Sequence, residues 1–297
     1  MTDVKSIGTH EPGAGEAPGT GRKAARKPGA GRGLRLLGTG IGRLWLFALL
    51  MVLWEVVTRI ANGSFFPPPS EIVAALHEIW FSGPASDLFL TEKAIEDFKP
   101  SFTNLFTGWA IAAVSGVLLG LVIGRSRFLG DLLDPLLQFL RAVPPPTMIP
   151  FLLVILDLDG PLQITTIAFG VVWPVLLNTI DGMHTVDRLQ LETARVFGIT
   201  GLTRLRRIIL PAAAPKIFAG LRVSLGFALI LMVISELIGQ TSGIGAHLIL
   251  AQQSFELAEM WAGIVLLGVL GCLFNMVFLL VERRVLGWHV GAKRLAD

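Results

Sequence analysis

Long apolar runs alternate with short polar segments along the chain from about residue 41 onward. A helix that spans a bilayer needs about 20 predominantly apolar residues. We therefore predict six membrane-spanning helices, at residues 41–60, 102–124, 132–156, 164–180, 217–238 and 261–281. The third segment contains Arg141 and the run Pro144, Pro145 and Pro146, so we expect a broken helix there. The pattern predicts an all-α integral membrane protein.

Small residues recur every four positions in the second predicted span, at Gly108, Ala112, Gly116, Gly120 and Gly124. Residues four apart lie on the same face of a helix. Small side chains allow membrane helices to approach each other closely. We therefore expect this face to pack against another helix.

The distribution of basic residues indicates the orientation of the chain. If the N-terminus is cytoplasmic, the cytoplasmic segments contain 20 of the 25 Lys and Arg residues, and the outer segments contain only Lys93 and Lys99. The outer segments in this arrangement are 61–101, 157–163 and 239–260. Cytoplasmic loops of membrane proteins are enriched in Lys and Arg. We expect six spans with both termini in the cytoplasm.

The composition agrees with a membrane protein and argues against a soluble one. The chain is 53% hydrophobic and 16% charged, with a mean hydropathy of +0.67, whereas soluble domains carry about 25% charged residues. It has one cysteine, Cys272, and no Cys/His cluster with the spacing of metal ligands. Neither a disulfide framework nor a metal site is therefore predicted. We expect His77, His184 and His247 to be solvated or interfacial.

Residues 1–36 are rich in Gly, Ala, Pro and basic side chains. Such a segment cannot bury enough apolar surface to offset its ordering entropy, so we expect a disordered cytoplasmic tail. A secretory signal is the alternative, but the basic region and the following apolar run are both too long for one. Residues 37–297 would form the membrane domain.

The long outer segment after the first span begins SFFPPPSEIVAALHEIW. Its prolines stop a helix, and Ser70 then stands where an N-cap residue is expected. Four apolar residues after it fall on one helical face, namely Ile72, Ala75, Leu76 and Ile79. We predict a short amphipathic helix on the outer side. Before it, Glu55 is expected to pair with Arg59, four residues later in the first span.

The cytoplasmic segment 181–216 contains the stretch ETARVFGITGLTRLRRIILP, residues 192–211. Asp187 is placed to cap a helix that ends near Gly198, which suits the left-handed position after a helix. Thr200 can cap a second helix, which we expect Pro211 to end and Pro215 to keep from resuming. Two short helices with a bend are predicted.

Two uses of this basic segment are open. Its arginines could lie at anionic lipid head groups, or the two helices could dock into a groove of a soluble partner. A lipid-facing helix needs neither the glycine bend nor the fixed Leu-Pro exit, whereas a docking element must hold its shape. The glycine bend and the Leu-Pro exit therefore favour docking.

The same stretch resembles the "EAA" motif of binding-protein-dependent ABC importer permeases. The pattern is Glu-Ala-Ala, three residues, Gly, nine residues, Ile, one residue, Leu-Pro, and the matching positions are Glu192, Ala194, Gly198, Ile208, Leu210 and Pro211, with Thr193 at the second position. Further segments are similar to the nitrate, taurine and aliphatic sulfonate permeases: FFPPPSEIVAAL, RAVPPPTMIP, PAAAPKIFAGLR, ISELIG and RRVLGWH. Residues 156–160, LDLDG, depart from the Trp-Phe-Gly-containing stretch of that subgroup.

The resemblance implies a type I ABC importer permease bundle in a bacterial inner membrane. The motif segment would be a coupling helix on an ATPase subunit, and the bundle would import a small organic or inorganic anion such as a sulfonate, taurine or nitrate. It further implies a second permease copy, two ATPase subunits that hold ATP and magnesium, and an extracytoplasmic solute-binding protein. The chain itself contains no Gly-x-x-x-x-Gly-Lys-Ser/Thr phosphate loop, so we expect neither enzymatic activity nor a bound cofactor, and no nucleic-acid partner.

Ionisable residues within the bilayer are costly and mark candidate functional sites. Glu236, near the outer end of the fifth span, could gate the pathway, snorkel toward the interface or form a helix–helix hydrogen bond. Arg141, beside Pro144, Pro145 and Pro146, could meet an anion in the pathway or lie over Asp134. We assign these residues to the translocation pathway. The small residues of the turn 242–245, namely Ser242, Gly243 and Gly245, would let a binding protein approach closely.

Two other classes of membrane protein are alternatives to an importer. An ion-coupled secondary transporter would need intramembrane carboxylates or an inverted repeat, and Glu55 and Glu236 near helix ends give it little support. A membrane-embedded enzyme would need clustered His, Asp or Ser residues at membrane depth, and the sequence shows none.

Overall fold

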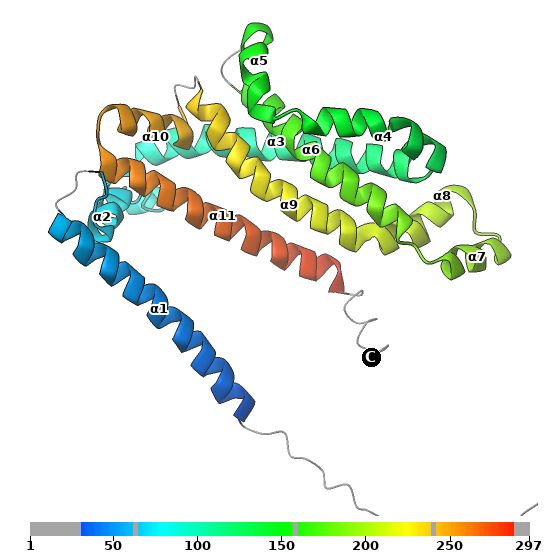
Figure 1. Cartoon of the computed structure of the whole chain (residues 1–297), viewed down its shortest axis with the longest axis horizontal. Helices are drawn as coiled ribbons and strands as arrows, with labels where there is room; N and C mark the ends of the chain where they lie inside the picture. The colour runs from blue at the N-terminus through cyan, green and yellow to red at the C-terminus, as the bar shows by residue number, and fades with distance from the viewer. Residues whose placement is uncertain (1–30, 62–64, 157–159, 239–241, 288–297) are drawn as a thin grey trace, which may run out of the picture. The chain divides into compact units, whose positions relative to one another are not determined.

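The computed structural model describes residues 31–61, 65–156, 160–238 and 242–287, with side chains described from residue 45 onward. All regular structure in these residues is helical (Figure 1). The chain divides into two units, Met1–Val52 and Leu53–Asp297. The last residues of α1, from Leu53 onward, and all the later helices belong to the second unit.

Helix α1, Gly31–Ala61, contains the first predicted span. Most of the predicted disordered tail lies outside the described residues. Its last part, residues 31–36, is helical and not disordered, because α1 already begins at Gly31. Helix formation is cooperative, so a long apolar helix extends into the basic residues that precede it.

Three long helices form the centre of the second unit: α3, Glu92–Gly124; α6, Pro161–His184; and α9, Leu210–Leu237. Helix α6 packs against both of the others (Figure 1). The glycine face of α3 meets α6, since a Cβ added at Gly116 or Gly120 would lie 2.9 or 2.6 Å from the Cβ of Val175 or Thr179. The predicted close packing of this face is confirmed. Helix α11, Leu257–Val285, packs on α9.

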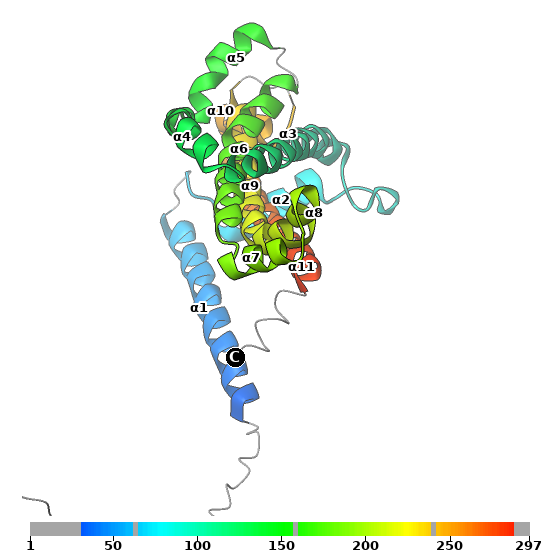
Figure 2. The same cartoon turned by 90° about the vertical axis from the view of Figure 1, so that its right-hand side faces the viewer.

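The third predicted span is broken, as expected. It consists of α4, Arg127–Ala142; the 3₁₀ turn η2, Pro145–Met148; and α5, Ile149–Ile155. The two helical parts meet at a 78° bend, which Figures 1 and 2 both show. In the residues described, four unbroken helices are long and apolar enough to cross a membrane, or five segments if the bent pair is one span. Helix α1 occupies the remaining predicted position.

Shorter helices cover the predicted outer end. They are α2, Pro69–Trp80; the 3₁₀ turn η1, Ala85–Asp87; and α10, Ile244–Gln253. The amphipathic helix is confirmed: α2 packs on α11 with Ile72 buried. The prediction that Ser70 is its N-cap is wrong. The N-cap is Pro68, because proline suits the first turn of a helix and Pro69 already occupies it.

The carboxylate of Glu55 supplies the interaction that caps α2. It accepts hydrogen bonds from the Ser70 N–H at 3.0 Å and from the Ser70 hydroxyl at 2.7 Å. Arg59 Nε lies 2.6 Å from the same carboxylate, which confirms the predicted Glu55–Arg59 pair. A carboxylate at a helix amino end is favourable, so this group joins the end of α1 to the start of α2.

Candidate functional site

The predicted docking segment begins with helix α7, Arg188–Val196. Asp187 caps it, as predicted, by accepting a 2.9 Å hydrogen bond from the Leu189 N–H. After the helix, Gly198 has φ +67°, in the left-handed region where a residue without a Cβ is favoured. The Ile199 N–H then donates to the Ala194 carbonyl at 2.8 Å, and the Gly198 N–H donates to the Arg195 carbonyl at 3.0 Å. This pair of bonds is a Schellman motif, and it fixes the direction in which the chain leaves α7.

The second half of the segment differs from the sequence prediction. Helix α8, Gly201–Arg204, does follow Thr200, whose side chain forms no capping bond. The chain then continues through a π-turn, η3, Leu205–Ile209, directly into α9. Pro211 therefore does not end the helix, and Pro215 lies inside α9. In the π-turn the Leu210 N–H bonds to the Leu205 carbonyl, five residues back, and the wider turn lets Pro211 follow without breaking the helix.

Both halves of the motif border one cavity of about 770 Å³ at this end of the protein. Thr193 and Ala194 line it from α7, and Ile208 and Pro211 line it from η3 and the start of α9. Figures 1 and 2 show α7 and α8 together at one end of α6 and α9. Of the other motif residues, Glu192 and Gly198 are exposed and Leu210 is half-buried.

Large apolar side chains are exposed on the same segment. The exposed fractions are 84% for Val196 and 75% for Phe197, next to the Gly198 turn, and Leu189 and Leu202 are also exposed. Clustered apolar residues on a polar, basic element are typical of a protein-binding surface. We call residues 187–211 the coupling segment.

The predicted pathway residues of the third span lie at the 78° bend. Arg141 is exposed in the last turn of α4, and Pro144 caps the 3₁₀ turn that contains Pro145 and Pro146. No ion pair between Arg141 and Asp134 is found in the described residues. The Asp134 carboxylate instead accepts a hydrogen bond from Gln138.

Glu236 is fully buried near the end of α9. Its Oε2 accepts a 2.8 Å hydrogen bond from the Gly245 N–H, in the first turn of α10. A Cβ at Gly243 or Gly245 would come within 2.8 or 2.7 Å of the Glu236 side chain. These two glycines therefore allow Glu236 to reach the amino end of α10, and the small residues of this turn face the protein's own carboxylate.

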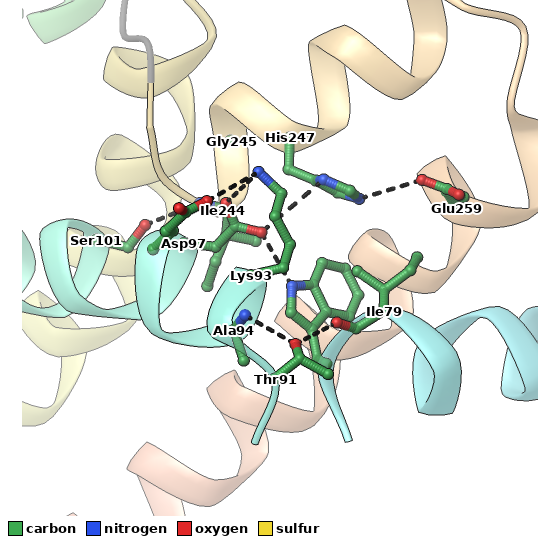
Figure 3. Close-up of polar contacts among 12 residues, drawn as sticks. Ile79, Thr91, Lys93, Ala94, Asp97, Ser101, Ile244, Gly245, His247 and Glu259 are labelled. Atoms are coloured by element: carbon green, nitrogen blue, oxygen red, sulfur yellow. Dashed lines mark hydrogen bonds and ion pairs between the residues drawn. The ribbon is translucent and has the colours of Figure 1, made fainter. Parts of the chain in front are cut away.

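A second buried polar cluster lies beside it, built on Asp97 (Figure 3). The Asp97 carboxylate is 1% exposed and accepts a 3.0 Å hydrogen bond from Trp80 Nε1. Lys93 Nζ lies 3.3 Å from Asp97, and His247 Nδ1 lies 3.9 Å from it. On its other side, His247 Nε2 lies 3.8 Å from Glu259. The cluster joins α2, α3, α10 and α11.

His247 was predicted to be solvated or interfacial, and the structure excludes a solvated side chain, because it is 8% exposed and lies between Asp97 and Glu259. Burial lowers the pKa of His247, and the neighbouring Asp97 carboxylate partly opposes this effect. The ion pair between Lys93 and Asp97 could have been predicted from the sequence, because residues four apart are neighbours on a helix. Trp80 and His247 come from distant segments, so no local pattern identified them.

Residues 116–287 match the family described as "Binding-protein-dependent transport system inner membrane component". The aliphatic sulfonates transport permease protein SsuC of Bacillus subtilis is 33% identical over 279 residues, which covers 93% of this chain and 96% of that protein. The nitrate import permease protein NrtB of Synechocystis is 30% identical, covering 80% and 86%. The bicarbonate transport system permease protein CmpB of Synechococcus elongatus is 32% identical, covering 63% and 67%.

Solved structures show the same fold. The inward-facing MetNI methionine ABC transporter has a chain with a TM-score of 0.57 and 18% identity, covering 64% of this chain and 95% of that one. The bacterial alginate ABC transporter gives a TM-score of 0.51 and 17% identity, covering 84% and 97%. The chain is therefore a multi-pass membrane protein with the fold of type I ABC importer permeases. It belongs to the family of binding-protein-dependent inner membrane transport components and is an ABC importer permease of the sulfonate, nitrate and bicarbonate type.

Proposed function

We propose that this chain is the membrane-spanning subunit of an ATP-driven importer of a small oxyanion. Three of its relatives are named for sulfonates, nitrate and bicarbonate. These solutes share a compact anionic group that presents several oxygen acceptors. The chain would contribute the pathway, and ATP with magnesium would be bound by a separate ATPase.

The observation that carries the proposal is the coupling segment, in which both halves of the motif border one cavity. Its exposed side chains Val196 and Phe197 would bind the ATPase, with Glu192 and Gly198 in the same surface. The Schellman motif after α7 holds the shape of this surface. A docking element transmits force only if it keeps its shape under load.

The remaining motif residues would connect this surface to the membrane helices. Ile208, Leu210 and Pro211 lie where the π-turn passes into α9, so motion of α7 would reach the bundle through a continuous helix. Thr193 and Ala194 would hold α7 against that junction, because they line the same cavity as Ile208 and Pro211.

The assembly would contain two permease copies, two ATPase subunits and an extracytoplasmic solute-binding protein in the bacterial inner membrane. The positions of the basic residues favour cytoplasmic termini, with the coupling segment on the cytoplasmic side. The bend at Arg141, Pro144, Pro145 and Pro146 would lie beside the pathway, where an irregular helix can be tolerated. Glu236 would act by holding the turn between α9 and α10, because its carboxylate is buried there.

Reconstitution tests the proposal directly. The permease is co-purified with its ATPase and placed in vesicles with the binding protein, and uptake of labelled ethanesulfonate, nitrate and bicarbonate is followed. We expect uphill uptake of one of these anions only when ATP and magnesium are supplied. Uphill uptake by the permease alone, driven by an ion gradient, would refute the proposal and show a secondary transporter.

A further inference from the structure

A cavity of about 770 Å³ lies at the predicted outer end of the bundle, away from the coupling segment. Its walls come from the first turns of α3, from Gly160 at the amino end of α6, and from Ser242 just before α10. Its volume falls within the range of about 300–1,000 Å³ of small-molecule sites. A small solute with part of its hydration shell would fit it.

Most of the polar side chains in this cavity come from α3. Three of them, Glu96, Lys99 and Thr103, are spaced by three and four residues, so they lie together on one face of that helix. Lys99 and Thr103 are exposed, and none of the ion pairs found in the described residues includes Lys99. The ammonium group of Lys99 is therefore available to a ligand.

Besides Lys99, the charged lining residues are one cation, Lys93, and two carboxylates, Asp97 and Glu96, so these three groups carry a net charge of −1. The buried Asp97 carboxylate is engaged by Trp80 and by Lys93, at 3.0 and 3.3 Å (Figure 3). Glu96 is exposed and lies 4.0 Å from Lys93. A carboxylate in this position weakens the attraction for anions, so its removal should strengthen anion binding.

Asn104 gives the cavity an unused hydrogen-bond donor. This side chain lines the cavity, is 4% exposed, and its amide nitrogen has no hydrogen-bond partner in the described part of the chain. A buried N–H group without an acceptor costs free energy. An oxygen acceptor in the cavity would remove that cost once the side chain turns this buried nitrogen toward it.

The amino end of α6 adds a favourable field. Gly160 is the N-cap of this 24-residue helix and lines the cavity. The amino end of a helix carries a partial positive charge and attracts anions. Thus a free ammonium group, an unpaired amide donor and a helix amino end meet around one space.

We propose that this cavity is a binding subsite for a small oxyanion on the outer side of the permease. Lys99 supplies the charge, and Asn104 and Thr103 donate hydrogen bonds to the oxygens. The site would receive the solute before it enters the pathway. This inference rests on the proposed function, because it assigns a place to the same class of solute.

Equilibrium binding of nitrate and of ethanesulfonate to the full-length permease in lipid nanodiscs tests the subsite. Lys99→Gln should weaken binding by about fivefold, as expected for a partly exposed ion pair. Asn104→Asp should weaken it by more than about tenfold, because a like charge would face the anion. Glu96→Gln is the matched control: it changes a charge in the same cavity, and binding should become tighter.

The outcomes separate this subsite from the proposed function. Opposite changes for Lys99→Gln and Glu96→Gln support an anion site, since a purely structural role for the cavity would not give opposite signs. Unchanged binding in both variants and in Asn104→Asp overturns the subsite, and ATP-driven oxyanion uptake by the same variants would then leave the importer assignment standing. Transport of a neutral solute instead of an oxyanion would contradict the proposed function itself.

Discussion

The contact between α3 and α6 allows a quantitative test, with Gly120→Ala as the perturbation. The added Cβ would lie 2.6 Å from the Cβ of Thr179 and 3.0 Å from the carbonyl oxygen of Leu176. Neither atom is the end of a flexible side chain, so the two helices must move apart. Overpacking of this kind costs about 1–3 kcal/mol. Replacing a glycine in the middle of a helix by alanine also gains about 0.5–1 kcal/mol.

Gly268→Ala is the matched control. Gly268 also lies within a long helix, α11, and an added Cβ would meet nothing within 4 Å. The gain in helix propensity is the same for both variants, so their difference isolates the overpacking cost of about 1–3 kcal/mol. We expect Gly268→Ala to be at least as stable as the wild type and Gly120→Ala to be less stable than Gly268→Ala by that amount.

The assay is thermal unfolding of the purified permease in detergent, followed by tryptophan fluorescence. For a chain of this size, 1 kcal/mol shifts Tm by about 2–4 °C, so the two variants should differ by roughly 2–12 °C. Equal Tm values for Gly120→Ala and Gly268→Ala would show that α3 and α6 are packed less closely than the structure places them.

Three further predictions concern the coupling segment and the Asp97 cluster. Glu192→Lys and Gly198→Pro should leave membrane insertion normal but abolish co-purification of the ATPase, as judged by affinity capture; full assembly and transport would refute the docking role. Trp80→Phe should lower the free energy of unfolding by about 1.5–3 kcal/mol, because the buried Asp97 carboxylate loses a donor; an unchanged Tm would exclude that bond. Because the pKa of His247 is lowered in the folded state, the unfolded chain binds more protons, so stability should fall as pH drops below about 6.5 toward the lowered pKa and stay level above it. His247→Gln should reduce this fall in a pH series of melting curves.

The fold was largely predictable because membrane helices leave strong local signals. The apolar runs located the long helices, and Pro144 to Pro146 located the bend in the third span. Gly198 and Asp187 were also predictable, since a left-handed turn and an N-cap depend on a few neighbouring residues. For such features the local sequence contains the whole cause.

Other features depend on partners that no local pattern reveals. Ser70 was expected to cap α2, but Pro68 holds the N-cap position, and the Ser70 hydroxyl instead bonds to Glu55, fifteen residues earlier. Pro211 was expected to end a helix, but the π-turn before it accommodates the ring. His247 was expected to be solvated or interfacial, and tertiary packing buries it against Asp97. For Ser70 and His247 the cause includes a contact between separate elements, whereas for Pro211 it is the π-turn directly before it.

The π-turn has a mechanical consequence. Residues Gly201–Leu237 form one helix of 37 residues, which at 1.5 Å per residue is about 55 Å long. If this helix stays straight, a tilt of roughly 10° about its Gly201 end would displace its Leu237 end by roughly 10 Å. Glu236, near the Leu237 end, is bonded to Gly245. A tilt of the helix about its Gly201 end must therefore either strain the hydrogen bond between Gly245 and Glu236 or be taken up by bending at residues 205–209, where the π-turn widens the helix.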